Sequence, residues 1–285
     1  MSSPRAQRPI EAPSGKGAGE ENFPVGSRLI APALRPHVMA YYAFARGTDD
    51  IADDEDLSPD EKIRRLDACE ASLRTGKGEP AFSRRLRESL AETGVPVEVA
   101  TDLLVAFRQD ARMLRYPDWQ ALLEYCRYSA HPVGRFLLVL HGEDDATAAP
   151  GDALCAALQV LNHLQDLASD RARLDRVYLP LDWMAEARID ETALDDGTTS
   201  PGLREVIDRC LDGTDTLLDR AAPLSGMVRS RRLAAEIAVI QRLARRLAAR
   251  LRHEDPLAAR VKHSRIDLLH GAAAGVLRLC GIARG

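Results

Sequence analysis

Six acidic residues fall within eight positions of the sequence, in residues 49–56 (DDIADDED). On a helix, residues four positions apart lie about 6 Å from each other on one face, so Asp49 and Asp53 form a carboxylate pair. Tyr42 and Arg46 precede this pair on much the same stripe. Like charges at this spacing disfavour a helix by a few tenths of a kcal/mol unless a cation lies between them. Mg²⁺ is the natural cation, because it prefers oxygen ligands.

A second polar stripe lies on a segment whose other positions are rich in leucine. Asn162, Asp166 and Asp170 recur every four residues in this segment. A polar stripe on an otherwise buried helix is costly unless partners or a metal satisfy it. Three arginines follow within residues 171–176, and guanidinium groups beside carboxylates suit a complex of Mg²⁺ with a diphosphate. Each pattern alone is weakly specific, but together they predict a Mg²⁺-dependent diphosphate site. The acids of residues 54–56, by contrast, are interpreted as a solvated helix end.

The elements that must position these residues are helices. Apolar residues recur at helical spacing from Asn22 onward, whereas alternating strand patterns are nearly absent. Helices are predicted over residues 36–54, 59–74, 81–92, 96–112, 118–140, 151–170, 201–222, 229–252 and 260–281. The breaks between them are short, and no internal repeat is present. The sequence therefore predicts one all-α domain over residues 21–285, preceded by a disordered tail over residues 1–20.

Composition excludes several other classes of protein. The chain has 285 residues, of which 45% are hydrophobic, and its net charge of -4 argues against nucleic-acid binding. The five cysteines are odd in number and lack zinc-ligand spacing, so we expect reduced and mostly buried thiols in the cytoplasm. We find no apolar core of a secretory signal in residues 1–20 and no stretch of ~20 apolar residues that could span a membrane.

The motifs resemble those of the squalene/phytoene synthase family. The resemblance rests on Ser27-Arg28, on residues 46–53 (RGTDDIAD), on residues 125–134 (YCRYSAHPVG), and on the second polar stripe followed by residues 176–180 (RVYLP). Their order and spacing agree from about Asn22 to the last predicted helix. Within the family, residues 21–25 (ENFPV) and 34–38 (LRPHV) are similar to the branch that forms hydroxysqualene in bacterial hopanoid biosynthesis.

This resemblance implies the isoprenoid-synthase helical bundle, with a central active-site cavity and the two aspartate motifs on opposite walls. The positions that match the family's metal ligands are Asp49, Asp53, Asp166 and Asp170. The positions that match its diphosphate-contacting arginines are Arg28, Arg46 and Arg176. The candidates for catalytic roles are Tyr125, Tyr42 and Asn162. For either tyrosine, the alternative is a core aromatic residue whose hydroxyl is satisfied by a neighbour.

Three positions depart from the family pattern. Gln165 precedes Asp166, where synthases that join two prenyl diphosphates commonly have arginine. Ala52 replaces an acid of the squalene synthase motif, and His131 stands where this branch is expected to have asparagine. The missing arginine favours an enzyme specialised for the second half-reaction. For His131 and His163, a hydrogen-bonded structural role is favoured over a catalytic one.

The resemblance therefore implies a carbon–oxygen lyase that converts presqualene diphosphate and water to hydroxysqualene and diphosphate, with Mg²⁺ and without a nicotinamide cofactor. The first alternative is a transferase that makes presqualene diphosphate, dehydrosqualene or phytoene from two prenyl diphosphates. The second is a non-catalytic relative that acts as an assembly or binding protein. The expected partner is a small-molecule prenyl diphosphate. Peripheral contact with a membrane, and functional coupling to upstream and downstream enzymes of the squalene pathway, are compatible with this interpretation.

Overall fold

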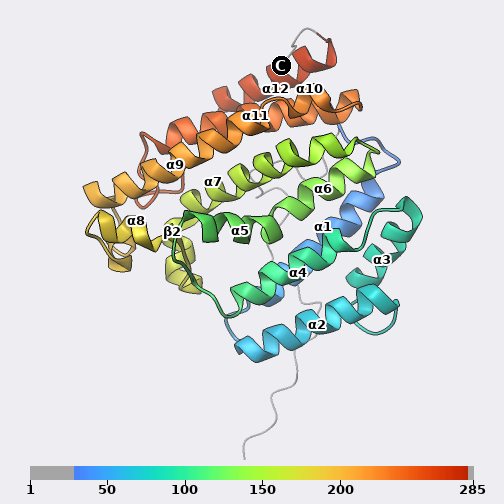
Figure 1. The fold of residues 1–285 in the computed structure, drawn as a ribbon, viewed down its shortest axis with the longest axis horizontal. Coiled ribbons are helices and arrows are strands. Elements are labelled where there is room, and N and C mark those ends of the chain that lie inside the picture. Colours follow the sequence, from blue (N-terminus) through green and yellow to red (C-terminus); the bar gives the residue numbers. More distant parts are fainter. Residues whose placement is uncertain (1–28, 282–285) are drawn as a thin grey trace, which may run out of the picture.

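The computed structural model describes residues 29–281, and helices make up most of this part of the chain (Figure 1). The first six helices are α1 (Arg35–Ala52), α2 (Pro59–Thr75), α3 (Ala81–Thr93), α4 (Glu98–Asp110), α5 (Trp119–Ser129) and α6 (His131–Leu140). The others are α7 (Ala148–Leu174), α8 (Leu181–Glu186), α9 (Pro201–Ala221), α10 (Leu224–Met227), α11 (Arg231–Leu251) and α12 (Arg265–Leu279). Short 3-10 turns occur at Asp145–Thr147 and Glu191–Leu194. The all-α prediction is confirmed, whereas the tail predicted over residues 1–20 lies outside the described residues.

Local signals set several helix ends. Ser58 caps α2, because its hydroxyl accepts a hydrogen bond from the Glu61 backbone, and Pro59 occupies the first turn, where its missing N–H is tolerated. Gly76 and Gly94 end α2 and α3 in the left-handed conformation, with φ of 73° and 71°. Glycine reaches this region without a steric penalty, so both helices stop there.

Apart from the two short helices α8 and α10, which were not predicted, and a last helix that begins at Arg265 rather than at residue 260, the structure differs from the predicted elements at two places. The helix predicted over residues 118–140 is interrupted at Ala130, whose φ and ψ are -123° and -44°. Pro132 lies in the first turn of the next helix, and proline cannot donate the hydrogen bond that would continue the preceding one. The second difference is a small parallel sheet, β1 (Arg115–Tyr116) paired with β2 (Val177–Pro180). Strands this short leave no alternating pattern in a sequence.

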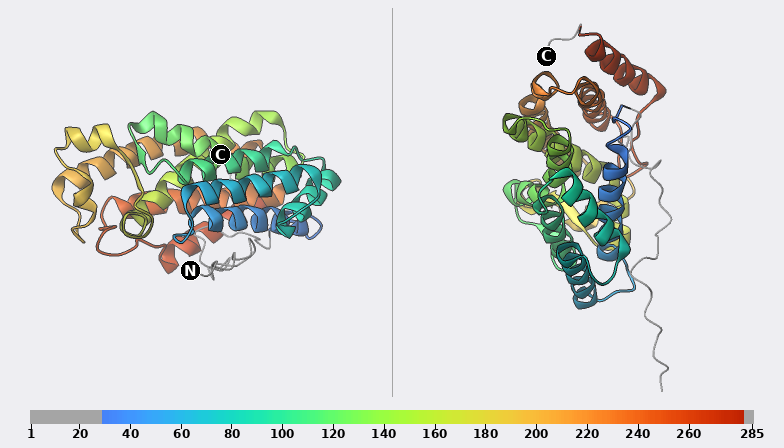
Figure 2. Two further views of the ribbon diagram at one scale, coloured as in Figure 1. Left: turned by 90° about the horizontal axis from the view of Figure 1, so that it is seen from below. Right: turned by 90° about the vertical axis from the view of Figure 1, so that its right-hand side faces the viewer.

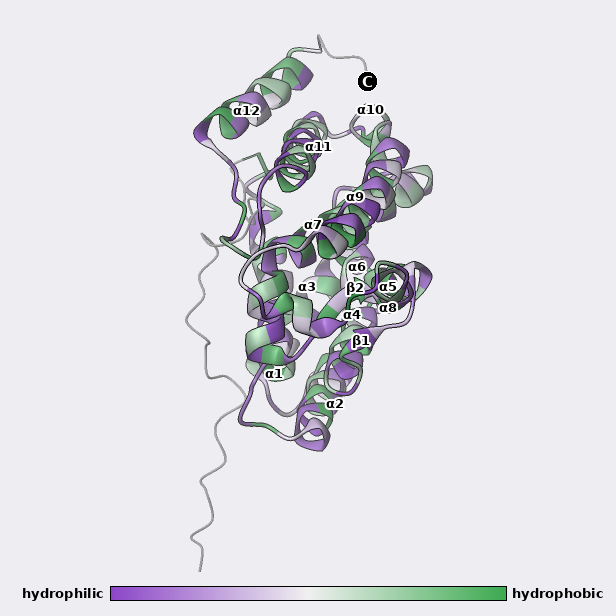
Figure 3. Cartoon of the chain, turned by 90° about the vertical axis from the view of Figure 1, so that its left-hand side faces the viewer, coloured by the Kyte–Doolittle hydropathy of each residue, from purple (hydrophilic) through white to green (hydrophobic). Residues whose placement is uncertain are grey.

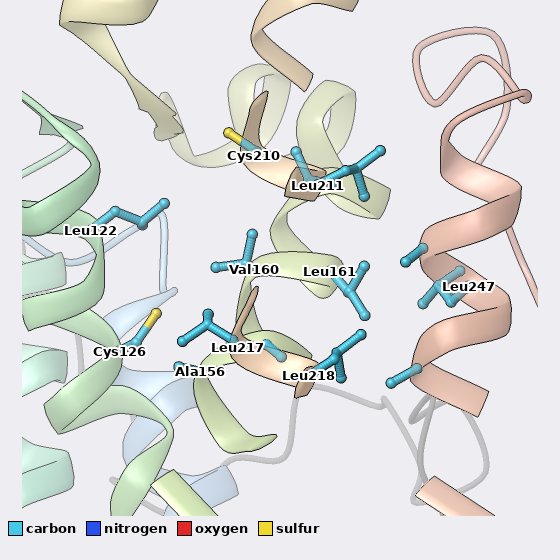
Figure 4. Close-up of a cluster of buried hydrophobic side chains, with 14 of the residues drawn as sticks. Leu122, Cys126, Ala156, Val160, Leu161, Cys210, Leu211, Leu217, Leu218 and Leu247 are labelled. Carbon is cyan, nitrogen blue, oxygen red and sulfur yellow. The ribbon is translucent and has the colours of Figure 1, made fainter. Parts of the chain in front are cut away.

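Two hydrophobic clusters hold the helices together. The larger one surrounds α7, which packs on α9, α6, α11 and α5. Figure 4 shows Val160 and Leu161 of α7 among side chains such as Leu122 of α5 and Leu247 of α11. The smaller cluster joins α1, α2, α3 and α4, and Phe136 of α6 belongs to it. Each fully buried leucine of these clusters stabilises the fold by roughly 1.5–3 kcal/mol.

The two aspartate motifs therefore belong to different parts of the molecule. The first lies on α1 in the smaller cluster, and the second lies on α7 in the larger cluster. Helix α12 packs on α11 at the outer edge of the molecule (Figure 2). Within residues 29–281, no helix combines the length and apolar character that crossing a membrane requires.

Candidate active site

The C-terminal half of α1 forms the first wall of the site. Arg46 contacts two acids of its own helix, Asp49 at 2.8 Å and Asp50 at 2.6 Å. Burial raises the pKa of Asp49 well above its usual value, and the nearby Asp53 raises it further, while Arg46 opposes the rise. The carboxylate pair predicted from the sequence is thus a place where a cation would be stabilising.

Arg176, which follows the second motif in the sequence, contacts the first motif. Its Nη1 lies 2.6 Å from an oxygen of Asp53, and its Nη2 donates to the backbone carbonyls of Ala52 and Asp110 at 3.2 and 3.4 Å. Asp175, with φ of 50°, ends α7 in the left-handed conformation, so that the chain reverses and Arg176 faces α1. The Arg176 side chain is only 6% exposed. Buried ion pairs need such additional hydrogen bonds to offset the loss of hydration.

A buried acid lies behind this contact. Asp110, the last residue of α4, accepts hydrogen bonds from the hydroxyls of Tyr125 at 2.9 Å and Tyr178 at 3.5 Å. Burial raises the pKa of Asp110 to about 6, although Arg176 and the Tyr125 hydroxyl act in the opposite direction. Asp110 thus joins Tyr125 of α5 and Tyr178 of β2, through its carboxylate, to Arg176, through its backbone carbonyl.

Asp110 was not predicted from the sequence, although a signal was present. Leu103, Phe107 and Asp110 are spaced as one face of a helix, and all three are buried. An acid on a buried apolar stripe must find partners, which makes such a position a candidate for a site. Tyr178 lies in the strand that the sequence did not indicate.

The second wall is formed by α7. Asp166 makes a two-pronged contact with Arg260, in which the nitrogen–oxygen distances are 2.6 and 3.0 Å. Arg260 comes from the irregular connection between α11 and α12, although the sequence placed it at the start of the last predicted helix, which begins only at Arg265. In the same connection, the backbone carbonyl of Val261 accepts a hydrogen bond from the buried Gln165 side chain. Gln165 is therefore engaged with the C-terminal connection.

His163 is a packed side chain of α7. Its ring stacks on the ring of Tyr178 with 3.6 Å between centroids, and its Nε2 lies 3.1 Å from the side-chain nitrogen of Gln159. Burial, together with the charge of Arg176, lowers the pKa of His163 to about 3, so the imidazole is neutral at physiological pH. These contacts agree with the hydrogen-bonded structural role that the sequence favoured. Asp170 lies 4.0 Å from the other ring nitrogen.

The remaining candidates are placed as follows. Tyr125 is buried with its hydroxyl bonded to Asp110, which is the alternative weighed for it; a role toward a substrate stays a prediction. Tyr42 on α1 and Asn162 on α7 are half-buried. Arg28 lies outside the described residues. His131 begins α6 and lies 3.6 Å from Asp152 on α7.

The carboxylates fit a metal that arrives with its substrate. Within residues 29–281, no group of three or more His, Cys, Asp and Glu side chains is gathered closely enough to hold an ion. Mg²⁺, however, usually takes one or two carboxylates and completes its octahedron with water and substrate phosphates. Asp49 and Asp53 offer such a pair, and because burial and the neighbouring Asp53 raise the pKa of Asp49, a bound cation would favour its charged form. The metal site itself stays a prediction.

Comparison with known proteins identifies the relatives of this chain. The family model described as squalene/phytoene synthase matches residues 17–267. The hydroxysqualene synthase of Rhodopseudomonas palustris is 44% identical over 262 residues, which cover 91% of this chain and 89% of that protein. The hydroxysqualene synthase of Zymomonas mobilis is 43% identical, with coverage of 93% and 91%.

Solved structures show the same fold. A squalene synthase from Alicyclobacillus acidocaldarius superposes with a TM-score of 0.74 at 34% identity, covering 82% of this chain and 89% of that one. A dehydrosqualene synthase superposes with a TM-score of 0.71 at 19% identity, covering 87% of each chain, which shows the fold alone. Because the family model matches most of the length of this chain, the chain belongs to the squalene/phytoene synthase family.

Proposed function

We propose that this enzyme converts presqualene diphosphate and water to hydroxysqualene, with release of diphosphate. The observation that carries the proposal is the identity of 42–44% over about nine-tenths of the chain to three hydroxysqualene synthases. The site supports it, since Arg176, which follows the second motif in the sequence, pairs with Asp53 of the first. The reaction makes the enzyme a carbon–oxygen lyase acting on a diphosphate.

The proposed ligands follow from the two walls. The residues that would hold Mg²⁺ are Asp49, Asp53, Asp166 and Asp170. The arginines that would hold the diphosphate are Arg46 and Arg176, joined by Arg28. When bound, Mg²⁺ supplies positive charge where the departing diphosphate becomes more negative. Arg46 contacts Asp49 and Asp50, and these contacts hold its guanidinium group at the site until the substrate binds.

The chemistry has three steps: ionisation, rearrangement of the cation and capture by water. The carbon–oxygen bond of presqualene diphosphate breaks and its electron pair leaves with the diphosphate, so that a carbocation remains in the site. After the cation rearranges, the oxygen of a water molecule forms the new carbon–oxygen bond and releases a proton. Tyr125, Tyr42 and Asn162 are the groups proposed to place that water. Tyr125 suits this role because Asp110 fixes the position of its hydroxyl.

The runner-up is a synthase that condenses two prenyl diphosphates. The observation that favours it is the 33% identity to phytoene synthase of Mycobacterium tuberculosis, over 67% of this chain. The position before Asp166 argues against it, because condensing relatives are expected to have arginine there. Here Gln165 is buried and bonded to the backbone of Val261. A non-catalytic role is disfavoured, because all four metal-ligand aspartates are present.

The product assay separates these functions. Purified enzyme is incubated with presqualene diphosphate and Mg²⁺ in H₂¹⁸O, without NADPH, and the products are identified by mass spectrometry. We expect hydroxysqualene that carries ¹⁸O in its hydroxyl. Formation of presqualene diphosphate from farnesyl diphosphate, with no turnover of added presqualene diphosphate, would instead establish the condensing synthase.

The metal requirement has its own test, which needs no turnover. Mg²⁺ with inorganic diphosphate should raise the melting temperature, whereas diphosphate with a chelator should raise it much less. A ligand at about 100 times its dissociation constant stabilises the folded state by roughly 2.7 kcal/mol. Equal shifts with and without the metal would mean that the arginines bind diphosphate without the aspartates.

A further inference from the structure

Helix α12 exposes a large apolar face. Among residues 29–281, ten large hydrophobic side chains are exposed, and five of them lie on this 15-residue helix. They expose between 44% and 68% of their surface and form what we call the α12 apolar face: Ile266, Leu268, Leu269, Val276 and Leu277. Contiguous apolar surface of this kind marks a place where a protein meets a partner or a membrane.

The orientation of α12 is determined by its other side. Asp267, Gly271 and Gly275 recur every four residues and are buried. A Cβ atom added at Gly275 would lie only 2.7 Å from Val239 of α11, so glycine permits the close approach of the two helices. Asp267 is held by Arg246 of α11 at 2.6 Å. Because these contacts hold this side of α12 against α11, the residues of the α12 apolar face must point outward.

The surroundings of this face are basic. Residues 256–285 contain five arginine and lysine residues and one acid, a net charge of +4, whereas the whole chain carries -4. The one acid, the buried Asp267, is paired with Arg246, and one of the five cations, Arg260, is paired with Asp166, which leaves four cations. In Figure 3, α12 is green and white over most of its length and purple near its ends. An apolar strip with cations beside it is complementary to an anionic lipid surface.

We propose that α12 docks on the surface of an anionic lipid bilayer and lies in the plane of the membrane. A helix of 15 residues is about 22 Å long and cannot cross a hydrocarbon core of ~30 Å. It can instead bury its apolar side chains among the lipids while the flanking arginines and lysines contact the headgroups. Within the described residues, the exposed side of α12 carries no acidic side chain that would oppose this contact.

The same helix is joined closely to the site. Arg260, which pairs with Asp166, lies only five residues before Arg265, the first residue of α12. Val261 bonds Gln165 of the same wall. This step rests on the proposed function: a polyisoprenoid diphosphate partitions into bilayers, so docking through α12 would hold the second motif next to the store of substrate.

Two other occupants fit the α12 apolar face less well. A second copy of the chain would bring two ends of net charge +4 together, which is repulsive. Residues 1–28 contain four basic and three acidic residues, and Met1, Ile10, Phe23 and Val25 are their only large apolar side chains. That segment offers neither the negative charge nor the apolar surface needed to cover the face.

Vesicle sedimentation of the full chain, without substrate, tests the proposal. The vesicles are phosphatidylcholine, with or without about 30% phosphatidylglycerol as the anionic lipid. We expect binding to the anionic vesicles that weakens as salt rises, because salt screens the basic flank. The double variant Leu269→Glu with Val276→Glu should lose roughly tenfold or more of the partition coefficient. The matched control is Val105→Glu with Val139→Glu, whose valines are 41% and 42% exposed on α4 and α6, and it should bind as the wild type does.

Circular dichroism and melting of both variants check that each is folded. Equal binding by the two variants, or no binding by the wild type, would overturn the proposal. A dimer in solution that only the α12 variant dissociates would show that a second copy covers the face. Binding that begins only when residues 1–28 are removed would show that this segment covers it. Vesicle binding without turnover of detergent-dispersed presqualene diphosphate would refute the proposed function and leave the docking surface standing.

Discussion

The two aspartate motifs solve the same electrostatic problem with different neighbours. Asp53 of the first motif is held by Arg176, whose side chain is 6% exposed and bonded to two backbone carbonyls. Asp166 of the second motif is held by Arg260, which is 36% exposed and lies in an irregular connection. The first counter-ion, Arg176, is therefore part of the packed interior, whereas the second, Arg260, is partly exposed to solvent.

This difference indicates a division of tasks. A buried arginine that bonds two helices cannot leave without exposing uncompensated charge, so the first wall is built before substrate arrives. The contact of Arg260 is partly hydrated, so a metal–diphosphate complex can displace it at little cost. We expect loss of the first counter-ion, Arg176, to affect folding and turnover, and loss of the second, Arg260, to affect mainly substrate binding.

The largest expected effect is that of Arg176→Met. The variant leaves Asp53 and Asp110 without their shared cation, which should destabilise the fold by about 3 to 5 kcal/mol in urea unfolding. Turnover should fall with it. Arg176→Lys serves as the control that keeps the charge and should recover part of the stability. An Arg176→Met protein as stable as the wild type would break the comparison between the walls.

Loss of an aspartate that is proposed to bind the metal should separate turnover from stability. Asp49→Asn and Asp170→Asn should each lower kcat by about 100-fold or more, because positive charge on the leaving group is lost. Asp49→Asn should melt at the same temperature or higher, since burial and Asp53 already oppose its charge. Steady-state kinetics and calorimetry measure both. A strongly destabilised Asp49→Asn protein with normal turnover would contradict the metal-site interpretation.

A pH series sharpens the view of the buried network. The pKa of Asp110 is raised from 3.8 to about 6, so its stabilising contribution is complete below about pH 3.8 and is lost as pH rises through about 6. Asp110→Asn resembles the protonated form at every pH. The stability of the wild type relative to this variant should therefore fall by up to roughly 3 kcal/mol between pH 4 and 7. A constant difference across that range would rule out the raised pKa.

The smallest effect is expected at the second wall. Arg260→Ala should change the free energy of unfolding by less than about 1 kcal/mol, because its ion pair is partly exposed. It should raise KM for presqualene diphosphate while kcat changes little. The control is Arg173→Ala. The contact of Arg173 with Glu55 spans 3.6 Å, and its side chain is 55% exposed. A kcat loss in Arg260→Ala as large as that of Asp49→Asn would make the two walls equivalent.

The sequence determined much of this protein by itself. Helical periodicity was enough for the all-α fold, because it records which face of each segment is buried. The carboxylate pairs were also readable, since four-residue spacing is a local property of a helix. Ser58, Pro59 and Gly94 show the same for helix ends, where one or two residues decide the backbone conformation.

Only the tertiary structure decided which charges meet. Arg176 and Asp53 are 123 positions apart, and Arg260 and Asp166 are 94 apart. Nothing local encodes such pairs, because they depend on how two hydrophobic clusters pack and on turns such as the one at Asp175. The same holds for the α12 apolar face: the sequence shows an apolar helix, but only its contact with α11 shows which side remains exposed to solvent. Long-range packing selects the partners of a side chain, and periodicity along one element carries no record of that choice.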